Sequence, residues 1–344
     1  CRIEATVVVT KRVLRGILAL VGHRSCFSLM AQRAELLLVP GCAPSYRPAP
    51  KPQRVQGLIS FAHRSSRPTR IIAVQPQERS AYLTAQAREH DPDRYLAALF
   101  APAERREAVL ALILFNHELA RVPDVVRQPI AGYIRYQWWR DALDEAVAGQ
   151  PPRQHPVAVT LAETLQRGWV AADPLQSLID ARERELEPMP AEDLAALENY
   201  LAQTSGLLQE LVLACLGGGS ADEQAAARAI GTAMGLVGVV HAIAHEARPQ
   251  HQLLPPPLLA EAGHGRIVTM ILARVDELLV QARRAAGRPA RALMPAFLPA
   301  RLVGAHARRI RAALDADPFR AAALARPVVG APLVLLAAYL RRRP

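Results

Sequence analysis

His241 and His245 have the residue type and the spacing of metal ligands. They stand four residues apart, with Glu246 beside them, and two histidines at this spacing on one helix face can bind zinc. The sequence offers no third ligand, and the order of residues differs from the His-Glu-x-x-His arrangement of zinc proteases. We therefore predict a histidine pair that faces a polar cleft rather than a zinc site.

Two charged groups at helical spacing are further candidates for a binding site. Glu118 and Arg121 stand three residues apart, Asp124 follows after another three, and a second group includes Asp180 and Glu185. Residues three or four apart share one face of a helix. Two interpretations are open for both groups: salt-bridged residues on helix surfaces, or side chains that line a ligand-binding cleft.

A pair of large aromatic residues, Trp138 and Trp139, precedes Arg140 in the segment that follows Pro129. Packing in the core is the first expectation for Trp138, because an indole ring buries a large apolar area. Trp139 and Arg140 are candidates for the lining of a ligand cleft.

The elements that must position these residues are predicted to be helices. Hydrophobic residues make up 51% of the chain and aromatic residues 5%, so the apolar content is mostly Ala, Leu and Val, a mixture that favours helix. Prolines at helix starts, glycines at helix ends and the lack of strand-like alternation support this interpretation. Helices are predicted over residues 102–121, 129–149, 157–167, 174–187, 191–203, 207–216, 221–247, 266–286 and 290–314.

Two of these helices have informative apolar patterns. Residues 110–115 are apolar on nearly all sides, which predicts a deeply buried stretch. In the helix that starts at Pro129, Ile130, Ile134 and Trp138 recur at every fourth position and are predicted to share one apolar face.

Positive charge is concentrated at the start of the chain. The chain has 42 Lys and Arg against 31 Asp and Glu, a net charge of +11; residues 1–75 hold 12 of these bases and 2 acids, which is +10 and leaves +1 for the other 269 residues. Nucleic acid is therefore not an expected partner of the main body. The four cysteines form no CxxC pair, which favours a reducing compartment.

The same asymmetry predicts two regions. Residues 1–85 form a basic extension rich in Pro and Arg that we expect to be poorly ordered, with an acid-poor composition similar to an organelle transit peptide. Residues 86–344 form the helical domain. No apolar run approaches the roughly 20 residues of a membrane-spanning helix. We expect a protein that is not secreted and lies in the cytoplasm or an organelle matrix.

Four segments, taken in order, resemble squalene/phytoene synthases over about residues 91–320. They are Leu99-Phe100-Ala101-Pro102 with the apolar run to Phe115; Trp138-Trp139-Arg140-Asp141-Ala142-Leu143 with Ala148-Gly149-Gln150-Pro151 and His155-Pro156; Leu178 to Glu185 with Tyr200 and Ser205-Gly206; and Gly231 to Glu246 with Leu254-Pro255. The second segment is the most specific. The resemblance implies a single all-α domain of the isoprenoid-synthase type with a central cleft.

The resemblance also implies a chemistry and a set of ligands. Members of the family join two prenyl diphosphates head to head, and Mg²⁺ held by acids on facing helices assists the departure of diphosphate. Matching of the motifs puts Ala120, Arg121 and Ala242 where acids are expected, while Asp124 and Glu246 keep an acid in register. Asp124 and Glu246 are therefore the candidate metal ligands, and Mg²⁺ is expected only if the protein is active.

The eroded motifs favour a branch of the family that lacks intact aspartate motifs and includes a mitochondrial complex I assembly factor and bacterial relatives. The leading hypothesis is a non-catalytic protein that binds a prenyl-diphosphate or lipid-like ligand, or a protein partner. The alternative is an active, Mg²⁺-dependent head-to-head prenyltransferase. A third hypothesis is an interaction protein whose cleft has collapsed.

The last apolar run of the chain leaves a further question open. Residues 328–340 are followed by Arg341, Arg342 and Arg343, a pattern that would suit an amphipathic helix at a membrane surface. A final core helix with a basic end fits the same pattern, and it is the slightly preferred expectation. Peripheral membrane contact is the alternative.

Overall fold

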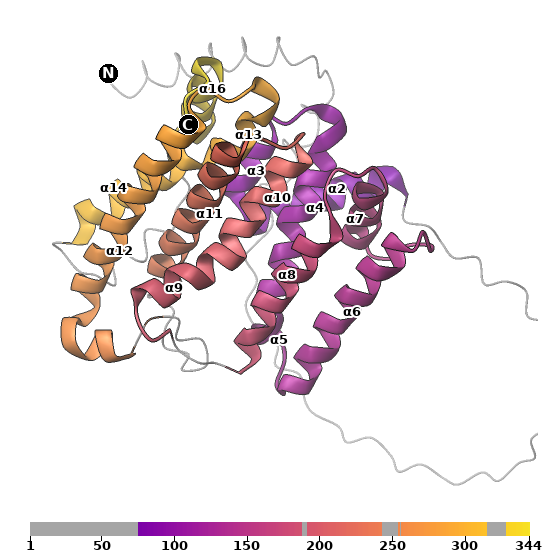
Figure 1. Cartoon of the computed structure of the whole chain (residues 1–344), viewed down its shortest axis with the longest axis horizontal. Helices are drawn as coiled ribbons and strands as arrows, with labels where there is room; N and C mark the ends of the chain where they lie inside the picture. Colours follow the sequence, from indigo (N-terminus) through magenta and orange to yellow (C-terminus); the bar gives the residue numbers. More distant parts are fainter. Residues whose placement is uncertain (1–74, 188–190, 243–253, 255, 315–327) are drawn as a thin grey trace, which may run out of the picture. The chain divides into compact units, whose positions relative to one another are not determined.

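The structure, a computed structural model, describes residues 75–187, 191–242, 254, 256–314 and 328–344. The regular elements in this part of the chain are all helical, which confirms the predicted all-α class (Figure 1). In chain order they are α2 (Pro76–His90), α3 (Pro92–Ala98), α4 (Ala103–Ala120), α5 (Val122–Val125), α6 (Pro129–Val147), α7 (Pro156–Gln166), α8 (Ala172–Glu183), the 3-10 helix η1 (Arg184–Leu186), α9 (Leu194–Leu201), the π-helix η2 (Ala202–Gly206), α10 (Leu207–Cys215), α11 (Ala221–Ala242), α12 (Pro256–Ala286), the 3-10 helix η5 (Arg291–Leu293), α13 (Met294–Phe297), α14 (Pro299–Leu314) and α16 (Ala331–Arg341).

Helix α2 begins at Pro76, inside the range 1–85 for which the sequence predicted a poorly ordered extension. Its side chains Leu83 and Ala87 are buried, and the helix packs against α4 and α7. The two buried residues stand in an otherwise polar stretch. For this reason the start of the helical domain was predicted from composition at residue 86, after the start of α2. Residues 1–74 and the predicted helical residues 243–247 lie outside the described residues.

Helix α4 carries an unbroken run of buried residues, 108–115, and it contacts α2, α7, α8 and α10. Its residues 110–115 are at most 2% exposed, which confirms the predicted deep burial of this stretch. A buried helix of this kind fixes the directions of the polar residues that follow it, because each successive side chain turns by about 100° around the axis.

Helix α11 is the second central helix and packs against α9, α10, α12, α14 and η2. The crossing with η2 is close: a Cβ atom on Gly231 would lie 2.8 Å from the Cα of Gly206. Among the described residues, α11 is the one helix long and apolar enough to cross a membrane, but 56% of that apolar window is buried inside the protein, as expected of a core helix.

The predicted face of α6 is wrong. Ile130 and Ile134 are 61% and 64% exposed, whereas Gly132, Tyr136 and Trp139 are buried. Gly132 explains the choice, since a side chain there would clash with Leu186. The helix therefore turns its glycine and aromatic face inward, and the two isoleucines face outward.

The helix predicted over residues 290–314 is divided into three elements. A 3-10 turn and the short helix α13 precede α14, which starts at Pro299. Pro295 occupies the first turn of α13. Proline lacks the amide proton that a continuous helix needs at each internal position, so Pro295 and Pro299 set the two starts.

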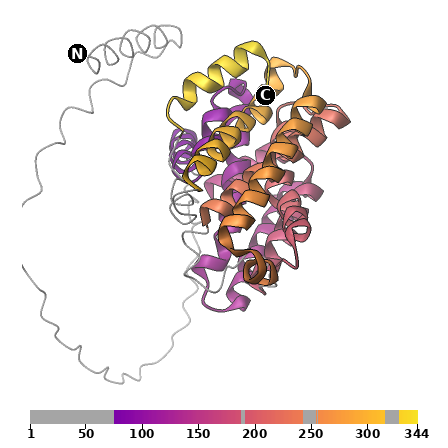
Figure 2. The same ribbon diagram turned by 90° about the vertical axis from the view of Figure 1, so that its left-hand side faces the viewer.

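The C-terminal helix α16 packs on α3 and α14, and it forms the last segment in the colour order of Figure 2. Ala331, Leu335 and Ala338 are buried in a small apolar cluster with Leu298 and Leu302. One face of α16 therefore is a core face, as preferred from the sequence.

Candidate functional site

A polar network joins α4, α8, η1 and α9 at the side of the buried α4 stretch. The Arg182 guanidinium lies at its centre: Nη1 donates to Glu185 Oε1 at 2.8 Å and to the Tyr200 hydroxyl at 3.0 Å, and Nη2 donates to Asn116 Oδ1 at 3.0 Å. The Tyr200 hydroxyl donates to the same Glu185 oxygen. The Arg182 and Glu185 side chains are 13% and 19% exposed. We call Asn116, Arg182, Glu185 and Tyr200 the inner network.

The charges of the inner network satisfy one another. Burial acts to lower the pKa of Arg182, but Tyr200 and Glu185 outweigh it and hold the pKa above its ordinary value. Burial raises the pKa of Tyr200, so its hydroxyl keeps the proton that it donates. A charge withdrawn from water is tolerated when an opposite charge and hydrogen bonds replace the solvent. The inner network meets both conditions.

Tyr136 of α6 contacts the backbone next to the inner network. Its hydroxyl lies 3.1 Å from the carbonyl oxygens of Leu119 and of Arg182 and donates to this pair. Burial raises its pKa far above the ordinary value. The contact ties the end of α4 to the end of α8, where the inner network lies.

The predicted residues Arg140 and Asp180 form a second, more open pair between α6 and α8. Arg140 Nη2 donates to Asp180 Oδ1 and to Glu183 Oε2, each at 2.7 Å, and Nη1 donates to Glu183 Oε1 at 3.1 Å. The side chain of Asp180 is 61% exposed. This cluster links two helices at the surface and leaves no uncompensated carboxylate.

Glu118 points to another side of α4 than the inner network. It lies two residues after Asn116 and pairs with Arg121 at 3.4 Å. Burial and then the Glu118 carboxylate raise the pKa of Tyr82 in α2. The same carboxylate opposes the lowering of the His155 pKa that burial causes. Glu118 therefore faces α2 and the start of α7, whereas Glu185 faces α4 and α9.

Trp139, predicted as a cleft residue, lies in the hydrophobic core. It is 5% exposed, and its ring meets the ring of Phe115 edge to face, with centroids 5.2 Å apart. Trp138 is the less buried of the two and packs at the edge of the core. Trp138 was expected to pack in the core; it packs against the core but is only partly buried, because α6 turns Trp139 inward.

His241 lies near the end of α11 beside His306 of α14, with ring centroids 5.3 Å apart. His306 Nε2 is 2.9 Å from Asp93 Oδ2 of α3. Burial lowers the pKa of His241 to about 4, with a further lowering by His306. The predicted partners His245 and Glu246 lie outside the described residues, so the predicted pairing of His241 with them stays a prediction.

The described residues do not fit the magnesium site that the resemblance implies. Mg²⁺ needs several oxygen ligands around one point, and no three His, Cys, Asp or Glu side chains gather in this way within the described ranges. Glu118 and Glu185 face different neighbours, and each is paired with an arginine. Asp124 is exposed in the short helix α5. Its pairing with Glu246 on a metal stays a prediction.

Asn116 and Arg182 were not among the residues predicted for the site. Arg182 stands three residues before Glu185, which is also the spacing of a surface ion pair. The signal that distinguishes a buried pair is Tyr200, which supplies the hydroxyl that a buried carboxylate needs. Its separation from Arg182 in the chain hides this relation.

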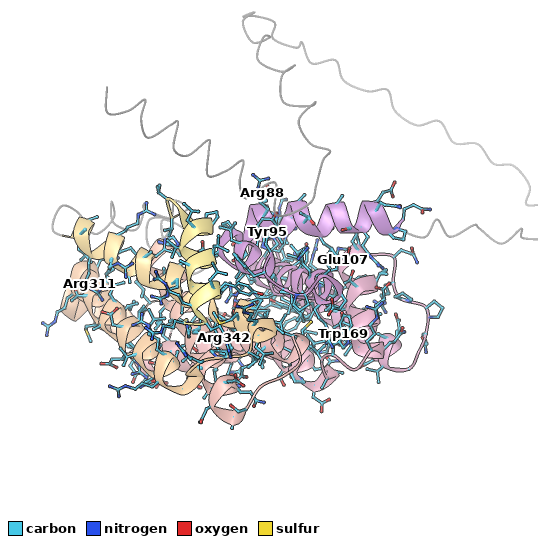
Figure 3. All side chains as sticks on the ribbon, turned by 90° about the horizontal axis from the view of Figure 1, so that it is seen from above. Arg88, Tyr95, Glu107, Trp169, Arg311 and Arg342 are labelled. Atoms are coloured by element: carbon cyan, nitrogen blue, oxygen red, sulfur yellow. The ribbon has the colours of Figure 1, made fainter. Side chains whose placement is uncertain are left out.

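A cavity of about 230 Å³ lies at a different place, between α2, α4 and α7. Glu107, Thr160, Glu163 and Trp169 contribute to its lining, and Figure 3 labels Glu107 and Trp169 on this side. Arg105 and Arg167 stack on the Trp169 ring at 4.0 Å and 4.8 Å. None of the residues predicted for the site lines this cavity.

The described elements form an all-helical bundle around the buried helix α4. The sequence model of squalene/phytoene synthase matches residues 87–329, so the chain belongs to the squalene/phytoene synthase family. The fold agrees with solved structures: a dehydrosqualene synthase in complex with ligand has a TM-score of 0.55 and 17% identity, and covers 77% of this chain and 96% of its own. Squalene synthase HpnC from Alicyclobacillus acidocaldarius has a TM-score of 0.55 at 16% identity, covering 77% and 94%.

Curated relatives carry a different name. "NADH dehydrogenase (ubiquinone) complex I, assembly factor 6" from Bos taurus is 33% identical over 174 residues, which are 51% of this chain and 52% of that protein. The Homo sapiens protein of the same name gives the same values. The Drosophila melanogaster homolog is 30% identical over 181 residues, 51% of this chain and 54% of its own. The matched region spans about half the length of these relatives.

Proposed function

We propose that this chain is a non-catalytic member of its family that serves as an assembly factor for a respiratory NADH dehydrogenase. The carrying observation is the pairing of its acids: Glu118 with Arg121, and Glu185 with Arg182 and Tyr200. The names of the relatives support the same role. These names also favour a location in the compartment that holds the NADH dehydrogenase complex. The sequence predicted either the cytoplasm or an organelle matrix, and the organelle matrix agrees with this.

The chemical reason lies in what the synthase reaction demands. A departing diphosphate needs concentrated positive charge that strengthens as the bond breaks, and Mg²⁺ supplies it when acids are free to hold the ion. Here arginine side chains already neutralise Glu118 and Glu185. At Glu185 a metal ion would have to displace the largely buried Arg182 guanidinium, which costs the protein this pairing. The Arg121 guanidinium at Glu118 is exposed, and its pairing is weaker.

The first test measures catalysis directly. Purified full-length protein is incubated with Mg²⁺ and farnesyl or geranylgeranyl diphosphate, and released diphosphate and extracted hydrocarbon are quantified. We expect no hydrocarbon and no diphosphate above the level of buffer alone. A squalene- or phytoene-like product would overturn the non-catalytic half of the proposal and establish the prenyltransferase alternative.

The second test measures assembly. Deletion of the gene is expected to deplete assembled NADH dehydrogenase on native gels, and the wild-type gene should restore it. Asp124→Asn is the informative variant, because it removes the acid that remains in register with the family's first motif. If the role is assembly without catalysis, this variant should restore the amount of assembled NADH dehydrogenase fully. Normal assembly in the deletion strain would contradict the assembly role, whatever the first test shows.

A further inference from the structure

The outer face of α16 is apolar although its inner face is already part of the core. Leu333 and Leu340 are 53% and 59% exposed and stand seven residues apart, on one side of the helix. Val334 beside them is 40% exposed. An apolar helix face rimmed by polar residues marks an interaction site more often than chance placement does.

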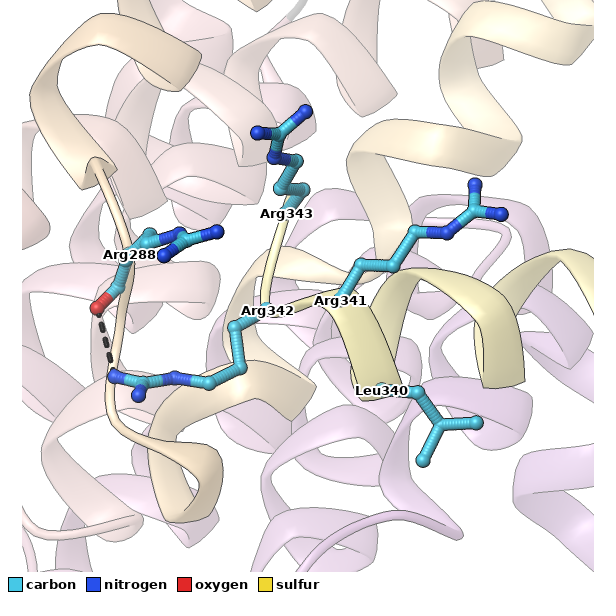
Figure 4. A pocket seen from close by; sticks show the side chains of 5 residues that line it. All are labelled: Arg288, Leu340, Arg341, Arg342 and Arg343. Atoms are coloured by element: carbon cyan, nitrogen blue, oxygen red, sulfur yellow. Dashed lines mark hydrogen bonds between the residues drawn. The ribbon is translucent and has the colours of Figure 1, made fainter.

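Arginines surround the end of this apolar face. Arg288, Arg341, Arg342 and Arg343 line a cavity of about 420 Å³ together with Leu340 (Figure 4). The guanidinium of Arg342 is fixed, since it donates to the carbonyl oxygens of Arg288 and Pro289 at 3.0 Å and 2.9 Å. The side chains of Arg288, Arg341 and Arg343 form the rest of the cationic lining.

Within the described ranges, no carboxylate forms an ion pair with Arg288, Arg341 or Arg343. Arg301 of α14 joins the group, because its Nη2 donates to the Arg343 carbonyl oxygen at 3.3 Å. Burial and then repulsion by Arg283, Arg341 and other arginines lower the pKa of Arg301. We call Arg288, Arg301, Arg341, Arg342 and Arg343 the C-terminal arginine surface.

We propose that the C-terminal arginine surface and the outer face of α16 bind an acidic helical segment of a partner protein. Carboxylates of that segment would enter the arginine-lined cavity, and its leucine-type side chains would cover Leu333 and Leu340. Arginine suits this task because its planar guanidinium binds a carboxylate through two parallel hydrogen bonds.

Charge and shape select this occupant. Residues 1–75 of the chain carry a net charge of +10, so they would be repelled. A second copy would bring the same arginines against themselves. A bilayer is broad and flat, whereas the arginines here line a cavity next to a single helix face. The inference does not rest on the loss of catalysis, because an active synthase could carry the same surface, so the two proposals can fail separately.

The test uses three helical peptides that share leucine positions and differ at their polar positions, which are glutamate, glutamine or lysine. Binding to the full-length protein is followed by fluorescence anisotropy. The glutamate peptide should bind about tenfold more tightly than the glutamine peptide, and added salt should reduce the difference. The lysine peptide should not bind. Equal affinity for the glutamate and glutamine peptides, or no binding of either, would overturn the proposal.

Variants locate the binding. Arg341→Glu with Arg343→Glu should weaken the glutamate peptide by about tenfold or more, and Leu340→Ser should weaken it several-fold without changing the net charge. The matched control is Arg127→Glu with Arg135→Glu, two exposed arginines near α6, which should leave affinity unchanged. If the control variant lost as much affinity for the glutamate peptide, the effect would come from net charge alone, and a localised site would be refuted.

A vesicle arm separates the protein partner from a membrane. Flotation with phosphatidylglycerol and with phosphatidylcholine vesicles is compared for the wild type and the Arg341→Glu/Arg343→Glu variant. We expect vesicle binding, if any, to be the same for both proteins. Capture by phosphatidylglycerol that the variant loses, with no change in peptide affinity, would assign the surface to a bilayer and overturn the proposal.

Discussion

The inner network and the C-terminal arginine surface treat positive charge in opposite ways. Arg182 is withdrawn from water and has a carboxylate, a hydroxyl and an amide oxygen as partners. Arg341 and Arg343 are exposed, and in the described part of the chain no acid is paired with them. The cation of the first region is paired within the fold, whereas the cations of the second retain charge for a partner.

The difference follows from the solvent. A buried cation must be paired within the fold, because the cost of leaving it alone exceeds what most domains can tolerate. An exposed cation is stabilised by water and has no such requirement. Arg182 and Glu185 are therefore satisfied by each other, while the exposed arginines, which have no acidic partner in the described part of the chain, retain charge for a partner. The predictions below test each half of this contrast.

The largest expected effect comes from removing the central cation of the inner network. Arg182→Met leaves Glu185 half-buried without its cation, and the free energy of unfolding should fall by about 3–5 kcal/mol. Urea denaturation followed by circular dichroism measures it. The double variant Arg182→Met/Glu185→Leu should recover part of the loss, because both charges are then absent.

Arg140→Met is the matched control for this prediction. Arg140 also bridges two helices, but its partners Glu183 and Asp180 are 27% and 61% exposed, and water can replace much of the lost hydrogen bonding. We expect a loss of about 1 kcal/mol or less. Similar losses for Arg140→Met and Arg182→Met would show that burial does not distinguish the two arginines.

The second prediction concerns a buried group that is kept neutral rather than paired. Burial lowers the pKa of His241 to about 4 in the folded protein, against roughly 6.5 in the unfolded chain. The unfolded chain therefore binds more protons between these values, and stability is lost as the pH falls from about 6.5 towards 4. The loss should be about 2–3 kcal/mol.

His241→Gln should flatten that part of the profile of unfolding free energy against pH. An identical slope for His241→Gln and the wild type would mean that other groups carry the pH dependence.

The third prediction tests the close packing of α11 against η2 in the interior of the protein. Ser205 of η2 donates to the Gly231 carbonyl oxygen at 2.6 Å, and a Cβ on Gly231 would meet the backbone of η2. Gly231→Ala should cost about 2 kcal/mol, because backbone atoms cannot move aside as a flexible side chain does. Gly238→Ala is the control: nothing lies within 4 Å of its added Cβ, and it should be neutral or slightly stabilising.

Thermal unfolding of the two glycine variants is enough to decide the matter. A lower melting temperature for Gly231→Ala alone is expected. If both variants behave alike, the close crossing of α11 and η2 contributes no constraint.

The fold was predictable from sequence in the parts where periodicity and punctuation agree. The run 110–115 is apolar on all sides and is buried as expected. The face of α6 was not predictable in this way, because two apolar stripes compete on one helix. The decision depends on Gly132 meeting Leu186, a contact between residues 54 positions apart in the sequence (186 − 132) that no local pattern reveals.

The candidate site was predictable only in its residue types. Glu118 and Glu185 were identified as candidates, but the direction of Glu118 depends on how α4 is rotated within the bundle, and Glu185 lies in η1 at the end of α8. Rotation is set by the tertiary packing of residues 110–115, after which Asn116 and Glu118 point to different sides. The pairing of Arg182 with Tyr200 requires α8 and α9 to be adjacent, and sequence spacing carries no such information.

The smallest expected effect concerns the C-terminal arginine surface. The informative quantity is the sign of the change in the free energy of unfolding. Arg341→Gln with Arg343→Gln removes two cations that repel Arg301, so the free energy of unfolding should stay within about 0.5 kcal/mol of the wild type and shift upward. The gain should shrink as salt screens the repulsion. Urea denaturation at low and high ionic strength measures both. A loss of stability comparable with that of Arg182→Met would mean that these arginines are paired within the fold, and the contrast between the two regions would then fail.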